Sequence, residues 1–363
     1  MWLTCSSIGR KLVMAITGVC LVLFVTFHCL MNSVAIFWPA AYNQICEFLG
    51  ANWYALIASA GLAVLFLIHI IYATWLTIQN RAARGNDRYA VSSRPAQVEW
   101  SSKNMYVLGI VILAFFVVHL IQFWAKMQLA ELRHAELSVL PVVEGIPAEP
   151  AFGTVLLQQA FSCWITPVVY LIGFIALWFH MNHGFWSMFH TVGWDNNIWI
   201  SRLKKIGCWW TSIVIVLFIA QAAVFTVRAN QKYYTSDAAL RAQYTEILGK
   251  GAEEILETLQ NDQSFMQAYR MQQFAGPAAI AQWAASDEAK EMVNRMRPYA
   301  QAAEALGAND FPLGIIKNIV DAADSQNQQE QLIPQDPVTG SFESSEGQDP
   351  NADDQAQESN NNN

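Results

Sequence analysis

Each of the first four long apolar stretches of the sequence contains at least one histidine: His28, His69, His119, and His180 together with His183. Four of them, His28, His69, His119 and His180, lie deep enough to act within the membrane. A polar side chain in lipid is costly, so residues of this kind are usually functional. A neutral imidazole is a common ligand of haem iron, and two imidazoles on opposite sides fill both axial positions. Such an iron carries electrons and does not readily bind oxygen. The four histidines therefore predict two bis-histidine haems.

Apolar runs long enough to cross a membrane must position these histidines, and they occur at about 12–37, 53–78, 105–126, 162–186 and 206–228. A helix satisfies its own backbone groups in lipid, so each run is expected to be a transmembrane helix. The chain is 54% hydrophobic and 14% charged, which is typical of a membrane protein. The predicted fold class is an all-α membrane protein with a five-helix bundle enclosing two haems. The first run is too long for a signal peptide and should stay attached.

The depth of each histidine predicts which two share a haem. With a rise of about 1.5 Å per residue, His28 and His119 lie about 5 Å to the outer side of their span midpoints. His69 and His180 lie about 5 and 8 Å to the inner side. No Asp or Glu occurs in any of the five runs, although a cation transporter usually has carboxylates beside its intramembrane histidines. Haem ligation in an outer and an inner layer is therefore favoured over a transporter.

The remaining histidines and the cysteines narrow the chemistry. His183 follows His180 by one turn and is the alternative inner ligand, but its greater depth places it near the headgroups. His134 and His190 lie outside the runs and are expected to be solvent-facing or locally hydrogen-bonded. The six cysteines form no C-x-x-C pair and no C-x-x-C-H motif, which argues against an iron–sulfur cluster, structural zinc or covalent haem in this chain.

Positive charges predict the orientation in the membrane. Lys and Arg gather before the first run, after the second and after the fourth, whereas the alternate loops 38–52 and 127–161 hold Arg133 alone. By the positive-inside rule the N-terminus is cytoplasmic, and five spans place the C-terminal part outside. Arg10 and Lys11 are also candidates for contacts with haem propionates, and the alternative is that they are topology signals only.

Beyond Arg228 the composition changes. Residues 1–228 carry 13 Lys and Arg against 8 Asp and Glu, while residues 229–363 carry 8 against 21. We expect a five-helix di-haem domain at 1–228, an extracytoplasmic helical extension at 229–324, and an acidic disordered tail at 325–363 that is rich in Gln, Asn and Ser. The acidic overall balance argues against nucleic acid as a partner.

Short motifs around the histidines resemble those of a known family, the di-haem, single-polypeptide cytochrome b anchors of succinate dehydrogenase and fumarate reductase. The resemblance covers about residues 1–228 and depends on four segments: SSIGRK at 6–11 followed by MAITG at 14–18, His28 four residues before Asn32, His180 four residues before Gly184, and GFWSMF at 184–189 with Gly193 and Trp194. The chain after Arg228 matches nothing in this pattern.

The resemblance implies a multi-pass subunit of succinate:quinone oxidoreductase in a bacterial cytoplasmic membrane, active in the tricarboxylic acid cycle or anaerobic respiration. Its implied cofactors are two non-covalent b-type haems and a quinone, with menaquinone expected. Its implied partners are an FAD-carrying flavoprotein, an iron–sulfur subunit on the cytoplasmic face and membrane lipid, and a homo-oligomer of the complex is compatible with this assignment. Dicarboxylate chemistry would belong to the flavoprotein, because this chain has no flavin or dinucleotide fingerprint. The alternative is a cytochrome b subunit of another dehydrogenase, such as hydrogenase or formate dehydrogenase.

A quinone site is expected beside the outer haem, at the outer ends of the first two spans. A quinol loses two protons as it gives up two electrons, so its site needs hydrogen-bonding groups and a proton acceptor. The connection between these spans offers Tyr42, Asn43 and Asn52 as contacts, with Glu47 as its only carboxylate and proton acceptor. The alternative for Glu47 is an ordinary surface acid.

Overall fold

The structure is a computed structural model, and it describes residues 6–84, 99–194, 196 and 198–332. The expected disordered tail from residue 333 onward lies outside the described residues, and so do Arg88 and Arg94, two of the basic residues after the second apolar run.

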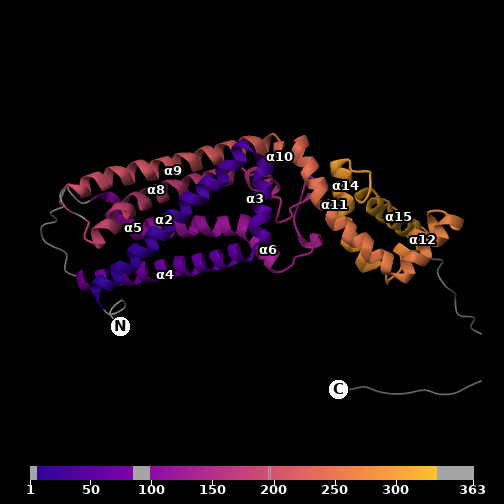
Figure 1. Cartoon of the computed structure of the whole chain (residues 1–363), viewed down its shortest axis with the longest axis horizontal. Helices are drawn as coiled ribbons and strands as arrows, with labels where there is room; N and C mark the ends of the chain where they lie inside the picture. The colour runs from indigo at the N-terminus through magenta and orange to yellow at the C-terminus, as the bar shows by residue number, and fades with distance from the viewer. Residues whose placement is uncertain (1–5, 85–98, 195, 197, 333–363) are drawn as a thin grey trace, which may run out of the picture.

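Long apolar helices form the first part of the molecule. Within the described residues, five helices are long and apolar enough to cross a membrane, which agrees with a multi-pass membrane protein. They lie side by side in Figure 1. They are α2 (Ser7–Phe37), α4 (Trp53–Arg84), α5 (Trp100–His119) with its π-helical continuation η1 (Leu120–Trp124), α8 (Ile165–Thr191) and α9 (Trp199–Asn230).

Each helix extends past its apolar run at one end or both, although α8 begins after the start of its run and η1 stops before the end of its run. The helix α2 begins before the run because Ser6 caps it, with the Ser6 hydroxyl accepting a hydrogen bond from Gly9 N at 2.9 Å. A capping side chain satisfies one of the amide groups that the first helical turn leaves unpaired. Hydropathy identifies only the stretch that suits the hydrocarbon core of a membrane. It therefore does not predict where the polar ends of these helices begin or end.

The end of the bundle opposite the N-terminus is built from short elements. The connection 38–52, expected as a loop, is largely the helix α3 (Pro39–Ala51), which starts at a proline, a residue whose fixed φ suits the first helical position. The other elements at this end are α6 (Gln128–Leu132), η2 (Leu137–Val139), the hairpin of β1 (Val142–Val143) and β2 (Ile146–Pro147), α7 (Gly153–Phe161) and α10 (Tyr233–Ser236).

Within the described residues, five further helices continue from that end, and we call them the C-terminal helical domain. Figure 1 shows them at the opposite end of the molecule from the N-terminus. They are α11 (Ala238–Asn261), α12 (Gln263–Ala275), α13 (Ala278–Ala284), α14 (Lys290–Leu306) and α15 (Leu313–Leu332). Asp237 and Asp262 cap α11 and α12 through hydrogen bonds to backbone amides. The helix α15 corrects the predicted boundary at residue 325, because its helical backbone continues to Leu332.

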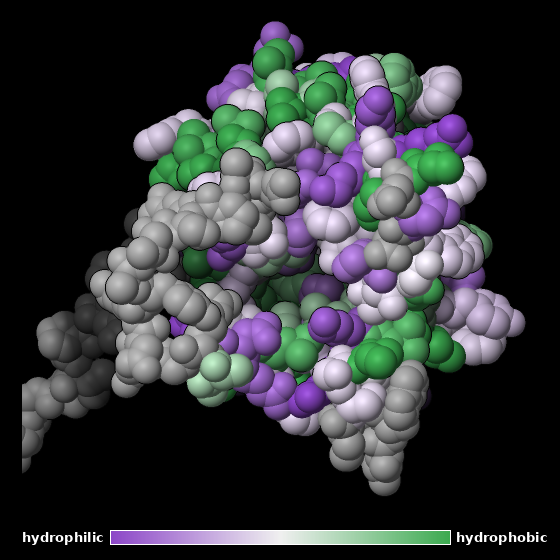
Figure 2. Space-filling model, turned by 90° about the vertical axis from the view of Figure 1, so that its left-hand side faces the viewer, coloured by the Kyte–Doolittle hydropathy of each residue, from purple (hydrophilic) through white to green (hydrophobic). Residues whose placement is uncertain are grey.

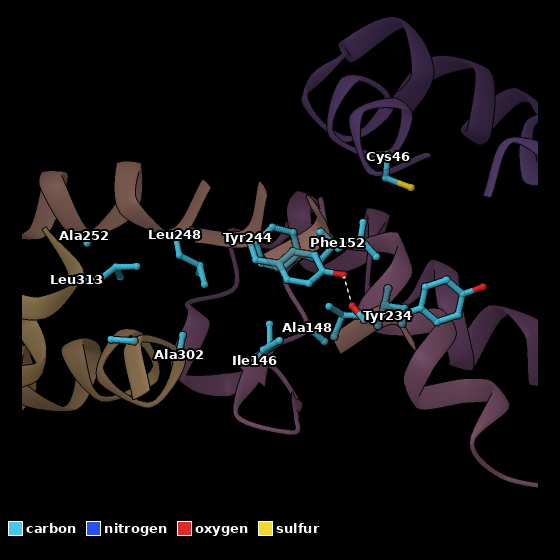
Figure 3. Close-up of a cluster of buried hydrophobic side chains, with 14 of the residues drawn as sticks. Cys46, Ile146, Ala148, Phe152, Tyr234, Tyr244, Leu248, Ala252, Ala302 and Leu313 are labelled. Carbon is cyan, nitrogen blue, oxygen red and sulfur yellow. Dashed lines mark hydrogen bonds between the residues drawn. The ribbon is translucent and has the colours of Figure 1, made fainter. Parts of the chain in front are cut away.

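One buried cluster joins the bundle to the C-terminal helical domain. Figure 3 shows Leu248, Ala252 and Leu313 in line with Ile146 and Phe152 near the bundle, all of them buried. At the junction, the Tyr244 hydroxyl donates to the backbone oxygen of Tyr234 at 2.9 Å, the bond drawn as a dashed line in Figure 3. The C-terminal helical domain and this end of the bundle therefore share one hydrophobic core.

The N-terminal end of the bundle presents a mixed surface. Figure 2 views this end and shows hydrophilic side chains spread among apolar ones. Basic residues stand in the terminal turns of the helices that end here: Arg10, Lys11, Arg81, Lys103, Arg202, Lys204 and Lys205. At the other end, Lys126 falls just beyond the apolar helix and joins Arg133 as a basic residue on that side.

Candidate functional site

The fold brings the four histidines together as two pairs. His28 of α2 and His119 of α5 have ring centres 5.7 Å apart with the ring planes at 88°, and we call them the outer pair because they lie nearer the C-terminal helical domain. His69 of α4 and His180 of α8 have ring centres 6.3 Å apart with planes at 67°, and we call them the inner pair. The depth argument predicted the same partners in the same two layers.

These separations fit a metal ion between each pair. Two imidazoles that bind one ion from opposite sides at about 2 Å each have their ring centres roughly 6 Å apart. Both observed separations match this value. Within the described residues no group of three or more His, Cys, Asp or Glu could hold a metal ion, so a metal centre made of protein ligands alone is not supported there. A bis-histidine haem needs only two, because the porphyrin supplies the other four ligands.

Flat aromatic side chains and glycines surround the pairs. Phe24 stacks on His28 with ring centres 5.5 Å apart, and Phe123 lies 5.4 Å from His119. At the inner pair, a Cβ added at Gly18 would lie 3.9 Å from His69 Cε1, and one at Gly109 would lie 3.9 Å from His180 Cε1. Apolar walls and small residues beside the ligands suit a large planar ring.

His183, the alternative inner ligand, is engaged elsewhere. Its Nδ1 lies 3.5 Å from a carboxylate oxygen of Glu99, and its ring packs edge-on against Trp186. Glu99 also accepts a hydrogen bond from Lys204 at 2.9 Å. His183 therefore belongs to a polar group at the N-terminal end of the bundle and not to the inner pair. His134 and His190 are exposed, as expected for residues outside the spans.

Arg10 differs from its neighbour Lys11. The Arg10 Nη1 donates to Gln79 Oε1 at 2.8 Å, and the guanidinium lies 5.7 Å from the ring centre of Trp75. Its Nε is buried and has no hydrogen-bond partner within the protein, whereas the side chain of Lys11 is exposed. A buried, unpaired N–H on a cation suits an anionic oxygen, such as the haem propionate that the sequence predicts as its partner. The geometry thus favours Arg10, and not Lys11, for that contact.

The residues expected at the quinone site do not converge. Tyr42 is buried and its hydroxyl donates to Asn32 Oδ1 at 3.2 Å, which leads toward His28. Asn43 is fully buried and serves the junction with the C-terminal helical domain. Asn52 accepts from the backbone N–H of Tyr54 at the start of α4. Glu47 lies exposed on α3.

The sequence reasoning missed Glu149, which precedes α7. Burial, followed by the nearby charges of Glu131 and Glu47, raises the pKa of Glu149 to about 7. A carboxyl group that titrates near neutrality is suited to proton exchange. No signal in the sequence singles out Glu149, because it is one of several acids in a connection between spans and its burial arises only from packing.

No protein-family model, curated protein or solved structure matches this chain.

Proposed function

We propose that this chain is the membrane-anchoring cytochrome b subunit of a succinate dehydrogenase or fumarate reductase, with two haems that link an iron–sulfur partner to a membrane quinone. The observation that carries the proposal is the pair of histidine pairs, each with the ring separation of a bis-histidine site, in two layers of an apolar bundle. A transporter would require polar groups along a path, and within the described parts of the five spans no Asp or Glu lies beside these histidines.

The residues of this chain hold and insulate the two sites. When bound, haem supplies a one-electron couple between ferric and ferrous iron. The outer pair joins α2 to α5 and the inner pair joins α4 to α8, so each site cross-links two helices of the bundle. Phe218 lies beside His28 and Phe115 beside His119, and Phe174 stacks on Phe218, so aromatic side chains surround the outer pair. A haem held by these two histidines in apolar surroundings would be suited to electron transfer.

The two ends of the bundle suggest where each partner of the electron transfer meets this chain. The basic residues at the N-terminal end agree with a cytoplasmic surface and with an acidic patch on an iron–sulfur subunit that carries electrons to or from the inner pair. Quinone chemistry belongs to the opposite end, beside the outer pair. There Glu149, with its pKa near 7, is a stronger proton acceptor candidate than the exposed Glu47.

The test is haem content and haem assignment in the purified complex. A pyridine haemochrome assay should give two non-covalent b-type haems per chain. His28→Ala and His119→Ala should each lose one haem, His69→Ala and His180→Ala the other, and the control His183→Ala should keep both. One haem or none in the parent protein, or loss of the inner haem in the control alone, contradicts the assignment.

Partner identity separates this proposal from a cytochrome b subunit of hydrogenase or formate dehydrogenase. Purification through a tag on this chain should bring down a flavoprotein and an iron–sulfur protein, and the preparation should catalyse succinate oxidation by quinone. Co-purification of a metal-containing hydrogenase or formate dehydrogenase subunit, without succinate activity, would establish the alternative.

A further inference from the structure

A continuous chain of hydrogen bonds starts at His119. The His119 Nδ1 lies 3.2 Å from the hydroxyl of Tyr170, and this hydroxyl donates to Gln122 Oε1 at 2.9 Å. The amide of Gln122 in turn donates to Thr166 Oγ1 at 3.1 Å. Tyr170 and Thr166 are buried on α8, and Gln122 lies in the π-helical turn η1 that follows His119.

The chain has a direction, and that direction sets the protonation of His119. A tyrosine hydroxyl has one proton, and in Tyr170 this proton forms the hydrogen bond to Gln122 Oε1. Toward His119 the tyrosine oxygen can then only accept, so the Nδ1 of a neutral His119 must carry the proton. The other ring nitrogen, Nε2, then has a lone pair and no proton. A histidine in this tautomer can bind a metal ion through Nε2.

The local backbone supports this arrangement. Ala125 N donates to Leu120 O at 2.8 Å, five residues back, so the helix widens immediately after His119. Single π-helical turns are rare and are concentrated at functional sites. Here the π-helical turn contains Gln122, whose side-chain oxygen accepts the hydrogen bond from the Tyr170 hydroxyl.

We infer that Tyr170 is a positioning residue for the outer haem, which fixes His119 as the Nδ1-protonated ligand and tunes the reduction potential of that haem. This inference rests on the proposed function. A hydrogen bond from Nδ1–H to an acceptor gives the imidazole more electron density, strengthens it as a donor and favours ferric iron. Tyr170 therefore lowers the midpoint potential of the outer haem.

The inner pair contains a matched contact that serves as a control. The Thr17 hydroxyl donates to Val13 O at 2.9 Å and lies 3.0 Å from His69 Nδ1, so by the same reasoning it accepts the proton of His69. Each pair thus has one ligand with a hydroxyl on its Nδ1: His119 in the outer pair and His69 in the inner pair. Removing one hydroxyl should affect one haem only.

The experiment compares Tyr170→Phe with Thr17→Val in the purified complex, by redox titration and by electron paramagnetic resonance of each low-spin haem. Phenylalanine keeps the ring that packs against Phe115, Phe161 and Phe174 and removes only the oxygen. Tyr170→Phe should raise the equilibrium constant for reduction of the outer haem by threefold to tenfold. A tenfold change corresponds to a midpoint potential higher by about 59 mV for a one-electron couple. Thr17→Val should shift the other haem and leave the outer haem unchanged.

A second variant keeps the inference testable if Tyr170→Phe does not fold. Gln122→Met removes the acceptor of the tyrosine proton, and a hydroxyl that no longer donates is a weaker acceptor, so the same haem should shift in the same direction by a smaller amount. Two bound haems with unchanged potentials in Tyr170→Phe or Gln122→Met, or equal shifts of both haems, overturn the inference. A parent protein without two haems overturns the proposed function as well, so the two failures are distinguishable.

Discussion

Gly173 of α8 packs directly against the ring of Phe115 of α5, so closely that a Cβ added at Gly173 would lie 2.4 Å from Phe115 Cγ. Phe115 lies one turn before His119, and their ring centres are 6.1 Å apart. The spacing of α5 and α8 at the outer pair therefore depends on the missing side chain of Gly173.

Gly173→Ala should push α8 away from α5 and disturb the outer pair. Overpacking of a close contact costs about 1–3 kcal/mol. We expect a lower unfolding temperature of the purified complex in detergent and a lower content of one haem. Gly61→Ala is the matched control, because a Cβ there meets nothing within 4 Å and an alanine favours the helix. Equal stability of the two variants would contradict the packing argument.

Arg10→Met should lower the midpoint potential of the proposed inner haem, because a positive charge near the iron stabilises the ferrous form, which has one positive charge fewer. Arg10 lies seven residues before Thr17, about 10 Å along α2, which is within the reach of a propionate. Lys11→Met removes an equal charge from an exposed position and should leave the potential nearly unchanged. Redox titration of both variants measures the difference, and equal shifts would reduce Arg10 to a topology signal.

Glu149 should make the protein less stable as the pH rises. Its pKa is about 7 in the folded protein and 4.5 for the free side chain, so between these values the folded state holds the proton more often than the unfolded state. The stabilising contribution is complete below about pH 4.5 and is lost as the pH rises through 7, at no more than about 1.4 kcal/mol per pH unit. Unfolding temperatures from pH 5 to 8 should show this loss in the parent and a weaker loss in Glu149→Gln. An identical pH profile in the variant would refute the assignment.

The same carboxyl group should matter for quinone turnover. Glu149→Gln should suppress succinate:quinone activity while both haem spectra and dye-linked succinate oxidation remain intact, because only proton exchange with the quinone is removed. Glu47→Gln is the comparison, since Glu47 is the acceptor that the sequence predicted but is exposed. Loss of activity in Glu47→Gln alone would restore the original assignment, and full activity in both variants would exclude these two carboxyl groups.

Asn43 should hold the C-terminal helical domain on the bundle. Its Oδ1 accepts from Thr154 N at 3.0 Å and from Thr154 Oγ1 at 2.9 Å, and its Nδ2 donates to Gln243 at 3.1 Å. Asn43→Ala leaves buried polar groups without partners, at a cost of about 1–3 kcal/mol. Faster hydrogen exchange in α11 should report the loosened junction, while the exposed neighbour variant Gln44→Ala should behave like the parent. Equal protection of α11 in both variants would contradict this role.

The sequence alone predicted the five long apolar helices and which histidines lie close together. Apolar runs must form helices in lipid, and the fixed rise of a helix converts residue number into depth, so one-dimensional information was sufficient for both. The same reasoning failed at the ends of the bundle. The connection 38–52 is a helix and α15 extends to Leu332, because capping and local packing, and not hydropathy, set those boundaries.

Only the tertiary structure decided which polar groups meet. Tyr170, Gln122 and Thr17 look like ordinary polar residues of apolar runs, and their contacts with His119 and His69 depend on how the helices rotate against one another. Burial and the charges of Glu131 and Glu47 raise the pKa of Glu149, and Asn43 is hydrogen-bonded to Gln243, 200 residues away in the chain. The depth of a residue follows from its position along a single helix. The direction in which its side chain faces and its burial depend on how the helices pack, and therefore the hydrogen-bond partners could not be predicted from the sequence.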